Sequence, residues 1–362
     1  MGRAGEKDAS PAGGSDVRGA VCFALDSDGF SCCRVLDAPE VWRVELLMGD
    51  TFLPSVNAFV VLDGGEALVV DTGTPDDYND TRLMRALLGL GIDPASMPVT
   101  LFCTHAHIDH MGLARELADA GVHVVVSEGV ASDMARFAVP EYRDVMVHRL
   151  VGEGVPAAEA VELADAIWSH AVSLPAAGVP FSTVAAGDVL RCGRWGFEVM
   201  LLPGHTPGQC GLWDPITRTA FLGDAVLFAC STFISFVDGW DAIGAQVETL
   251  RQLADRDVEH AFLGHGLAEG PLAERCLANV AHHERRSARA LTAVRERPGQ
   301  TGFELVGAMG WHAPVERWSE LPALTRWFLA SESAAHLDHL VATGAVRREA
   351  GKDGVTRYWP AG

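Results

Sequence analysis

The sequence predicts an α/β protein built around a buried β-sheet, and two observations lead to this prediction. Apolar runs of four to six residues are closed by glycine or a polar turn, a pattern typical of buried strands. Longer segments between them begin with Pro and Asp or stop at Gly, as helices do. The apolar runs that matter most for function are Val99–Cys103, Phe197–Leu202, Thr219–Leu222 and His260–Leu263.

Each of these four runs leads into side chains that can bind a metal. The first is followed by Thr104-His105-Ala106-His107-Ile108-Asp109-His110, and the others by His205, Asp224 and His265. Neutral imidazole and carboxylate suit Zn and its neighbours, and a lone carboxylate such as Asp224 can bridge two ions. Seven candidate ligands, enough for two ions, are therefore predicted: His105, His107, Asp109, His110, His205, Asp224 and His265.

The order His-x-His-x-Asp-His, His, Asp, His resembles the metallo-β-lactamase superfamily, over about residues 56–267. The turn Asp71-Thr72-Gly73, after Glu66–Val70, adds to the resemblance. It implies an αββα sandwich with the metals at one edge. It also implies a first metal bound by His105, His107 and His205, a second bound by Asp109, His110 and His265, and Asp224 between them.

Two catalytic roles follow from this site. Asp109 is expected to orient the attacking oxygen and receive its proton, and Asp71 to hold a ligand histidine in its metal-binding tautomer. The expected cofactors are two divalent ions, Zn first, with Mn or Fe as alternatives. The sequence contains no Gly-x-Ser-x-Gly elbow and no phosphate-cradling glycine loop.

The ligand set excludes several branches of the superfamily, but it does not identify one reaction. True β-lactamases generally lack a residue like Asp224, and flavodiiron proteins carry Glu where this chain has His107. Nucleases with an inserted domain need far more than the 40 residues between Asp224 and His265. The enzyme classes that this ligand set still allows are hydroxyacylglutathione hydrolases, lactonases, thioesterases, RNA-processing enzymes and iron-dependent persulfide dioxygenases.

Two segments beside the ligands are candidates for a substrate pocket. Residues 129–170 have helical character and either cap the pocket or pack on the sandwich. The apolar, aromatic segment 226–236 follows Asp224 and suits an acyl chain or a hydrophobic ring if it is a loop. The alternative is that it forms a core strand.

The C-terminal segment resembles a winged helix, with helices at 282–295, 302–310 and 324–343 and a hairpin at 345–358. It holds 11 Lys and Arg against 9 Asp and Glu, so the rest of the chain carries more than the whole net charge of −20. Such acidity argues against a nucleic-acid surface on the catalytic part. The third helix, which would read DNA, contains Glu332 and Asp338 and few basic residues. The basic residues of the first helix and the wing either meet phosphates or face solvent.

Composition sets the remaining expectations. We predict an N-terminal extension, partly disordered, at 1–40, a catalytic domain at 41–281 and a winged-helix-like domain at 282–362. The N-terminus lacks an apolar signal core, no apolar run reaches the roughly 18 residues of a membrane span, and a cytoplasmic location is expected. The eight cysteines show no Cys-x-x-Cys spacing, which predicts buried free thiols.

The function predicted from the sequence is a dinuclear metal-dependent hydrolase of a thioester or activated ester. The expected partner is a small-molecule acyl substrate, on coenzyme A or a carrier protein, with neither nucleic acid nor membrane. A metal-dependent endoribonuclease and an iron-dependent oxidative enzyme are the alternatives.

Overall fold

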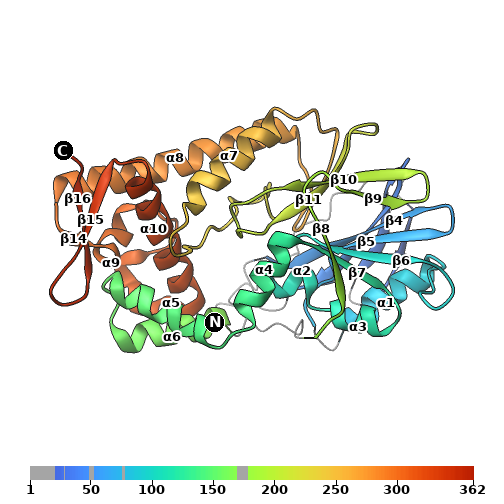
Figure 1. Cartoon of the computed structure of the whole chain (residues 1–362), viewed down its shortest axis with the longest axis horizontal. Helices are drawn as coiled ribbons and strands as arrows, with labels where there is room; N and C mark the ends of the chain where they lie inside the picture. The colour runs from blue at the N-terminus through green and yellow to red at the C-terminus, as the bar shows by residue number, and fades with distance from the viewer. Residues whose placement is uncertain (1–20, 28, 49–52, 76–77, 169–177) are drawn as a thin grey trace, which may run out of the picture.

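The computed structural model describes residues 21–27, 29–48, 53–75, 78–168 and 178–362, and Figure 1 shows their arrangement. Of the N-terminal extension predicted at 1–40, residues 1–20 and 28 lie outside the described ranges. Two sheets occupy one end of the molecule, and the C-terminal helices gather at the other.

The first sheet has eight strands that follow one another in chain order. The ladder is antiparallel up to the fifth strand and parallel from the fifth to the eighth. Its strands are β1 (Cys22–Ala24), β2 (Ser31–Asp37), β3 (Glu40–Leu47), β4 (Ser55–Asp63), β5 (Glu66–Val70), β6 (Val99–Cys103), β7 (His123–Ser127) and β8 (Phe181–Val184).

The second sheet has five strands in the order β13-β12-β11-β10-β9, and only its β12–β13 pair is parallel. These strands are β9 (Val189–Cys192), β10 (Trp195–Leu201), β11 (Cys210–Asp214), β12 (Thr219–Gly223) and β13 (His260–Leu263). The four apolar runs singled out in the sequence correspond to β6, β10, β12 and β13.

Aromatic side chains join the two sheets face to face. The Phe59 ring of β4 lies 5.6 Å from the Phe221 ring of β12 and 5.1 Å from the Phe262 ring of β13. Burying such rings stabilises the sandwich, because each removes a large apolar area from water. The predicted α/β fold is confirmed.

Short helices lie against the first sheet on its outer face (Figure 1). They are α1 (Asn79–Gly89), α2 (Ile108–Met111) and α3 (Ala114–Asp119). Asp109 and His110 lie within the single turn of α2, which is followed closely by α3.

The predicted insertion is helical, and its parts pack on different neighbours. It comprises α4 (Glu128–Phe137), α5 (Glu141–Gly152) and α6 (Ala157–Ile167), and its last residues, 169–170, lie outside the described ranges. Helix α4 packs on β7 and β8 of the sandwich, whereas α6 packs on the C-terminal helix α10 (Ala323–Ala342). The insertion was expected either to cap the substrate pocket or to pack on the sandwich. Packing on the sandwich describes α4 but not α6.

A C-terminal helical domain is present, as predicted. It contains α8 (Leu272–Glu296), α9 (Gly302–Leu305), η2 (Val306–Ala308), η3 (Val315–Glu320) and α10, with a small sheet of β14 (Gln300–Thr301), β16 (Thr356–Pro360) and β15 (Val346–Ala350). Helix α8 continues through the predicted boundary between residues 281 and 282. The winged-helix assignment and the domain limits stay predictions.

Hydrogen bonds and ion pairs between buried charged side chains connect the insertion to this C-terminal domain. Arg149 of α5 donates two hydrogen bonds of 2.8 Å to Asp338 of α10 and lies 3.0 Å from Glu153. The fully buried Tyr358 donates its hydroxyl to Glu153 at 2.9 Å. Removing one partner of such a network leaves an unpaired buried charge, so these contacts fix how the two parts meet.

The first forty residues contribute strands to the first sheet, and the expectation that all eight cysteines are free thiols was wrong. Strands β1 and β2 belong to the first sheet, so the sheet begins before residue 41, because β2 pairs with β3. Cys22 and Cys33 form a disulfide, whereas free thiols were expected, because the two residues face each other across β1 and β2. Five of the six remaining cysteines are buried and free, and Cys230 is exposed.

Candidate metal centre

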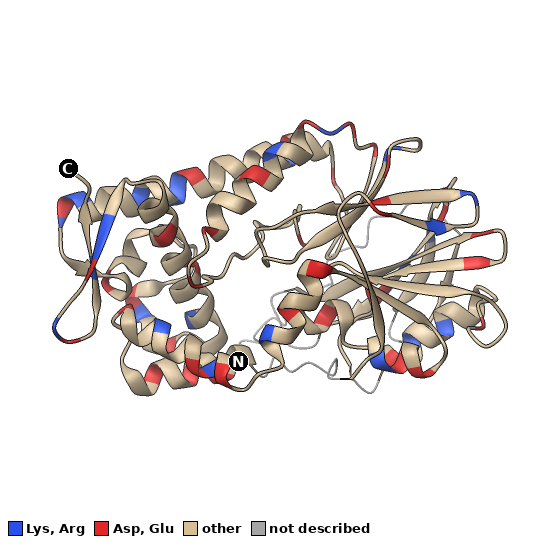
Figure 2. Cartoon of the chain, viewed as in Figure 1, with Lys and Arg blue, Asp and Glu red and all other residues tan. Residues whose placement is uncertain are grey.

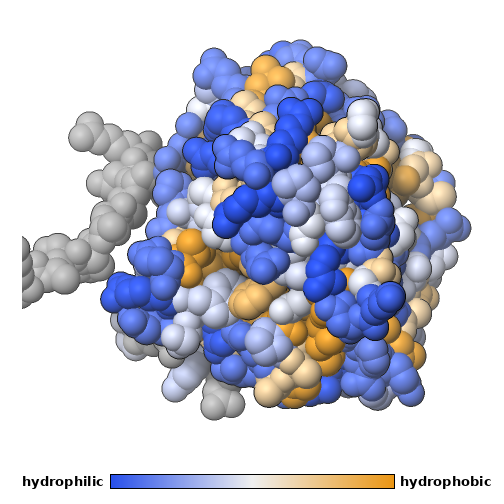
Figure 3. Space-filling view, turned by 90° about the vertical axis from the view of Figure 1, so that its left-hand side faces the viewer, coloured by the Kyte–Doolittle hydropathy of each residue, from blue (hydrophilic) through white to orange (hydrophobic). Residues whose placement is uncertain are grey.

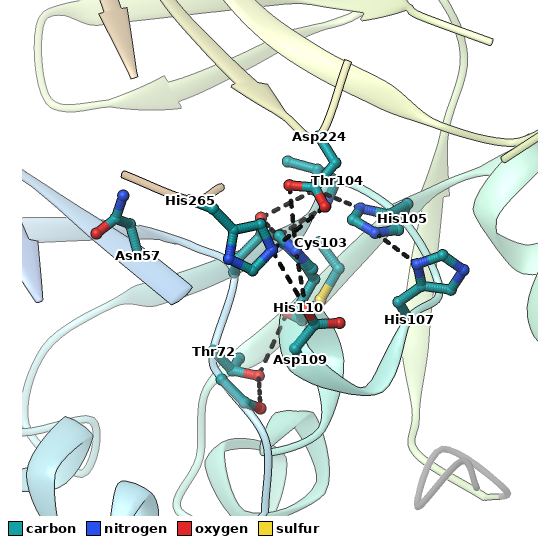
Figure 4. A network of polar contacts seen from close by, with 12 residues as sticks. Asn57, Thr72, Cys103, Thr104, His105, His107, Asp109, His110, Asp224 and His265 are labelled. Carbon is teal, nitrogen blue, oxygen red and sulfur yellow. Dashed lines mark hydrogen bonds and ion pairs between the residues drawn. The ribbon is translucent and has the colours of Figure 1, made fainter. Parts of the chain in front are cut away.

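The seven predicted ligands come together where strands of both sheets end, and Figure 4 labels all of them except His205. Strands β5 and β6 are parallel, as are β12 and β13, and the carboxyl ends of parallel strands meet at one edge of a sheet. His105 follows β6, Asp224 follows β12 and His265 follows β13. We call these seven side chains the sandwich centre: His105, His107, Asp109, His110, His205, Asp224 and His265.

Three imidazoles of the sandwich centre converge on one point. His107 Nδ1 lies 3.1 Å from His105 Nε2 and 3.0 Å from His205 Nε2. Tetrahedral binding of Zn at about 2.0–2.1 Å separates ligand atoms by about 3.3 Å. This group of three nitrogens therefore fits one ion.

A second group lies on the other side of Asp224. His265 Nε2 is 3.3 Å from both Asp109 Oδ2 and Asp224 Oδ2. His110 Nε2 is 3.6 Å from Asp109 Oδ2 and 3.5 Å from Asp224 Oδ1. Asp224 Oδ2 also lies 3.8 Å from His205 Nε2, so its carboxylate stands between the two groups.

Hydrogen bonds at the outer ring nitrogens direct Nε2 of three histidines inward. His110 Nδ1 donates to Asp71 Oδ2 at 2.7 Å. His265 Nδ1 donates to the Ser55 carbonyl at 2.8 Å, and His205 Nδ1 donates to the Phe233 carbonyl at 2.7 Å. Such bonds fix the tautomer and the ring orientation of metal-binding histidines. The sequence pointed to Asp71 but could not reveal the two carbonyls, which are present in every residue.

Asp71 is held in turn by Thr104, the residue before His105, for which no role was predicted from the sequence. Thr104 donates its backbone N–H to Asp71 Oδ1 at 2.8 Å and its hydroxyl to Asp71 Oδ2 at 2.9 Å. Asp71 has φ +62°, in the left-handed region that Asp and Asn tolerate better than most residues. Both side chains are buried, so this support is sheltered from water.

Close packing and hydrogen bonds fix the backbone on both sides of His265. A Cβ on Gly264 would lie 2.2 Å from Asp224 Oδ1, so only glycine fits there. Asn57 of β4 donates its side-chain amide to the carbonyls of Leu263, at 3.0 Å, and Gly266, at 2.7 Å. A role for Asn57 was not predicted, because nothing in the sequence relates β4 to this distant loop.

Charges within the sandwich centre shift the histidine pKa values in opposite directions. Burial, together with the neighbouring His205, lowers the pKa of His107 to about 3. Burial also disfavours charge on His265, but Asp224 and Asp109 outweigh it and raise that pKa to about 10. The first group thus offers neutral imidazoles, and the second pairs its histidines with carboxylates.

The same charges keep the two carboxylates ionised. Burial alone would raise the pKa of Asp224, but His265 and His110 hold it well below its usual range. His110 and His265 likewise lower the pKa of Asp109 despite its burial. The ionised carboxylate is the form in which Asp109 and Asp224 bind metals, whereas His265 must release a proton to bind one.

Two buried atoms of the sandwich centre have no hydrogen-bond partner among the described residues. They are His110 Nε2 and Asp224 Oδ1, which face each other at 3.5 Å. A buried polar atom without a partner costs about 1–3 kcal/mol, which a bound cation removes. The donor set and these two atoms fit divalent metal ions.

Aromatic groups border the sandwich centre. The ring of Phe137, at the end of α4, stacks 6.3 Å from the ring of His107. Phe233, whose carbonyl holds His205, packs its ring 4.4 Å from Phe328 of α10. Residues 226–236 form a loop, not the core strand considered as an alternative.

Comparison with known proteins identifies the family. The sequence profile of the metallo-beta-lactamase superfamily matches residues 52–265. The chain belongs to this superfamily. A second profile, the metallo-beta-lactamase-like C-terminal domain, matches residues 319–361. The superfamily consists largely of hydrolytic metalloenzymes, and its matched region contains all seven side chains of the sandwich centre.

Individual relatives are more distant. An uncharacterized protein of Aquifex aeolicus is 28% identical over 207 residues, which cover 56% of this chain and 77% of that protein. The hydroxyacylglutathione hydrolase GloC of Haemophilus influenzae is 29% identical over 169 residues, covering 46% of this chain and 63% of the hydrolase. The chain thus spans less than two thirds of the length of GloC.

Two solved structures share the fold. A beta-lactamase domain protein from Burkholderia ambifaria superposes with a TM-score of 0.76 at 23% identity, covering 91% of this chain and 94% of that one. A metallo-beta-lactamase family protein from Thermus thermophilus gives a TM-score of 0.70 at 22% identity, covering 88% of this chain and 98% of that one. Among the described residues, no helix is long and apolar enough to span a membrane.

Proposed function

We propose that this protein is a two-metal hydrolase that cleaves a thioester or activated ester of the acyl-CoA or carrier-protein type. The observation that carries the proposal is the position of Asp224, whose carboxylate oxygens lie 3.3–3.8 Å from histidines of both groups. One carboxylate between two sets of ligands suits a pair of ions. Imidazole and carboxylate together favour Zn, with Mn or Fe as alternatives.

In this proposal each residue of the sandwich centre has a role. His105, His107 and His205 would hold one ion, Asp109, His110 and His265 would hold the other, and Asp224 would be shared between them. Bound divalent ions supply hydroxide near neutral pH and polarise a carbonyl oxygen. Asp109 is ionised and within 3.3 Å of His265 Nε2, so its carboxylate can orient the attacking oxygen and accept its proton. Asp71 keeps His110 in the tautomer that points Nε2 inward.

The surroundings of the sandwich centre support an acyl substrate. Phe228 and Phe233 are partly buried in the loop after Asp224, and Phe137 lies beside His107. Apolar and aromatic walls with few polar groups suit an acyl chain better than a sugar. The name of the Haemophilus relative, a hydrolase of an acylated glutathione, is consistent with this chemistry.

The C-terminal domain argues against a nucleic-acid substrate. Helix α10 would be the reading helix, yet more than half of its residues are buried within the protein. Basic and acidic residues are interspersed along the C-terminal helices (Figure 2), and hydrophobic areas interrupt the hydrophilic surface of this end (Figure 3). Several arginines there already contact carboxylates: Arg286 with Glu332, Arg347 with Glu349, Arg348 with Asp338 and Arg357 with Asp353.

Thiol release from a panel of acyl-CoA and acyl-pantetheine substrates tests the proposal. The protein is assayed after its metals have been counted, beside His105→Ala as the control. We expect release that depends on chain length and disappears in His105→Ala, because that variant lacks a ligand of the first group. No release from protein holding two ions would contradict the thioester proposal, and RNA or lactone cleavage by the same sample would replace it.

A further inference from the structure

A second buried group of metal-capable side chains lies between two helices of the C-terminal domain. His283 of α8 and Glu332 and His336 of α10 place their donor atoms within 4.8 Å of one another. All three side chains are buried, with His283 at 1% and His336 at 0% exposure. We call these three residues the helix cluster.

Helical spacing explains how the helix cluster forms. Glu332 and His336 are four residues apart, so they lie on the same face of α10. That face packs against α8, which supplies His283 and, one turn later, Ser287. The Ser287 hydroxyl is hydrogen-bonded to His336 Nδ1 at 2.8 Å, which leaves His336 Nε2 directed at Glu332 Oε1, 3.8 Å away.

Three nitrogens of the helix cluster lack hydrogen-bond partners among the described residues. They are His336 Nε2 and both ring nitrogens of His283. An unpaired buried polar group costs about 1–3 kcal/mol, and native proteins contain few of them. Burial also lowers the pKa of His283 to about 3 and that of His336 well below its usual value. Both rings are therefore neutral, and a neutral imidazole has one nitrogen lone pair that can bind a cation.

We propose that His283, Glu332 and His336 bind one further divalent transition-metal ion, of the Zn class. Two imidazoles and one carboxylate form a known ligand set for Zn, with water in the fourth position. The bond between Ser287 and His336 Nδ1 is the support that metal-binding histidines usually have at their other nitrogen. Nothing in this site depends on the sandwich centre or on its reaction.

Arg286 makes this site weaker than the sandwich centre. Its guanidinium contacts the Glu332 carboxylate and lies 3.9 Å above the Trp311 ring. Part of the negative charge that would face an ion is therefore already neutralised. The sandwich centre offers Asp109 and Asp224 with no arginine bound to either in the described structure. Metal added gradually fills the sandwich centre first and the helix cluster last.

An ion in the helix cluster would link α8 to α10 beside the loop of residues 226–236. His282, beside His283, lies 3.3 Å from the Ser231 hydroxyl through its Nε2. Phe328, one turn before Glu332, packs on Phe233 of the same loop. The expected consequence is a metal-dependent gain in stability of the C-terminal helices.

Metal counting on full-length variants tests the proposal. Chelator-stripped wild type, His283→Gln, His336→Gln and His282→Gln are titrated with Zn at buffered free concentrations. We expect His283→Gln and His336→Gln to bind about one ion fewer than wild type. His282→Gln is the matched control, since it changes the same residue type at the adjacent position, and it should bind as many ions as wild type.

Diffraction on the wild-type protein tests the site without any substitution. Crystals grown with Zn should show an anomalous peak about 2.0–2.1 Å from nitrogens of His283 and His336. Anomalous peaks at the sandwich centre alone, with water between His283 and His336, would overturn the proposal. Equal Zn counts in all four proteins would overturn it as well.

Discussion

The sandwich centre and the helix cluster are both buried groups of histidine and carboxylate, but they differ in charge. The sandwich centre contains two carboxylates among its seven side chains, and Asp71 lies against it. The helix cluster has one carboxylate, which Arg286 already contacts. Burial disfavours charge on both rings, but Asp224 and Asp109 outweigh it and raise the pKa of His265 to about 10, whereas burial lowers that of His283 to about 3. Carboxylates thus decide how much positive charge a buried histidine group can hold.

The largest effect is expected from removing the carboxylate between the two halves of the sandwich centre. Asp224→Ala should lower kcat/KM by about 10²–10³-fold, the scale seen when a group acting on developing charge is lost. It should also weaken both metal sites, because Asp224 lies close to histidines of each group. Steady-state kinetics and metal analysis on the same sample measure both effects.

Asp257→Ala serves as the control for that substitution, because Asp257 is exposed and pairs only with a surface arginine in the described structure. It should leave turnover and metal content unchanged. An Asp224→Ala protein that retains two ions and wild-type turnover would refute the bridging role.

A smaller effect is expected from Asp71, which supports the sandwich centre through His110. Asp71→Asn keeps a side chain that tolerates φ +62° but removes the negative charge facing His110 Nδ1. Metal affinity or activity should fall about 10–100-fold. Competition with a chelator measures the affinity, and unchanged affinity would show that Asp71 serves only the backbone of Thr104.

The smallest effect is the pH dependence of stability in the chelated protein, where the two regions act in opposite directions. The raised pKa of His265 adds stability below the unfolded value of 6.5, which is lost as pH rises toward about 10. His283 stays neutral in the fold, so its unfolded form binds protons first and stability is lost as pH falls from 6.5 to about 3. Each group changes the free energy of unfolding by up to about 1.4 kcal/mol per pH unit.

Urea denaturation with a chelator present, at several pH values, checks this prediction. His265→Gln should flatten the alkaline side of the stability curve, and His283→Gln should flatten the acid side. If both variants follow the wild-type curve on both sides, the assigned charge states are wrong.

The same contrast explains what the sequence could and could not predict. The ligands of the sandwich centre follow buried strands, whose apolar runs end sharply at polar residues, so the motif is visible in a linear sequence. The helix cluster joins His283 of α8 to Glu332 and His336 of α10, through the packing of two helices that are far apart in the chain. Helical spacing relates Glu332 to His336, but no local signal relates either of them to His283.

The first forty residues and the insertion were predicted less well for a related reason. Pairing of β2 with β3, and of Cys22 with Cys33, depends on which segments meet in the sheet. Likewise α6 packs on α10, which is more than 150 residues away in the chain. Long-range contacts of this kind have no periodic signature within either segment.

Recovery of activity during metal titration tests the central claim most directly. Chelator-stripped protein is titrated with Zn while thioester cleavage and bound metal are followed together. The account predicts that activity reaches its plateau at about two ions per chain, and that a later ion at the helix cluster leaves activity unchanged. Full activity in the stripped protein, or a plateau at one ion, would contradict a two-metal centre built on Asp224.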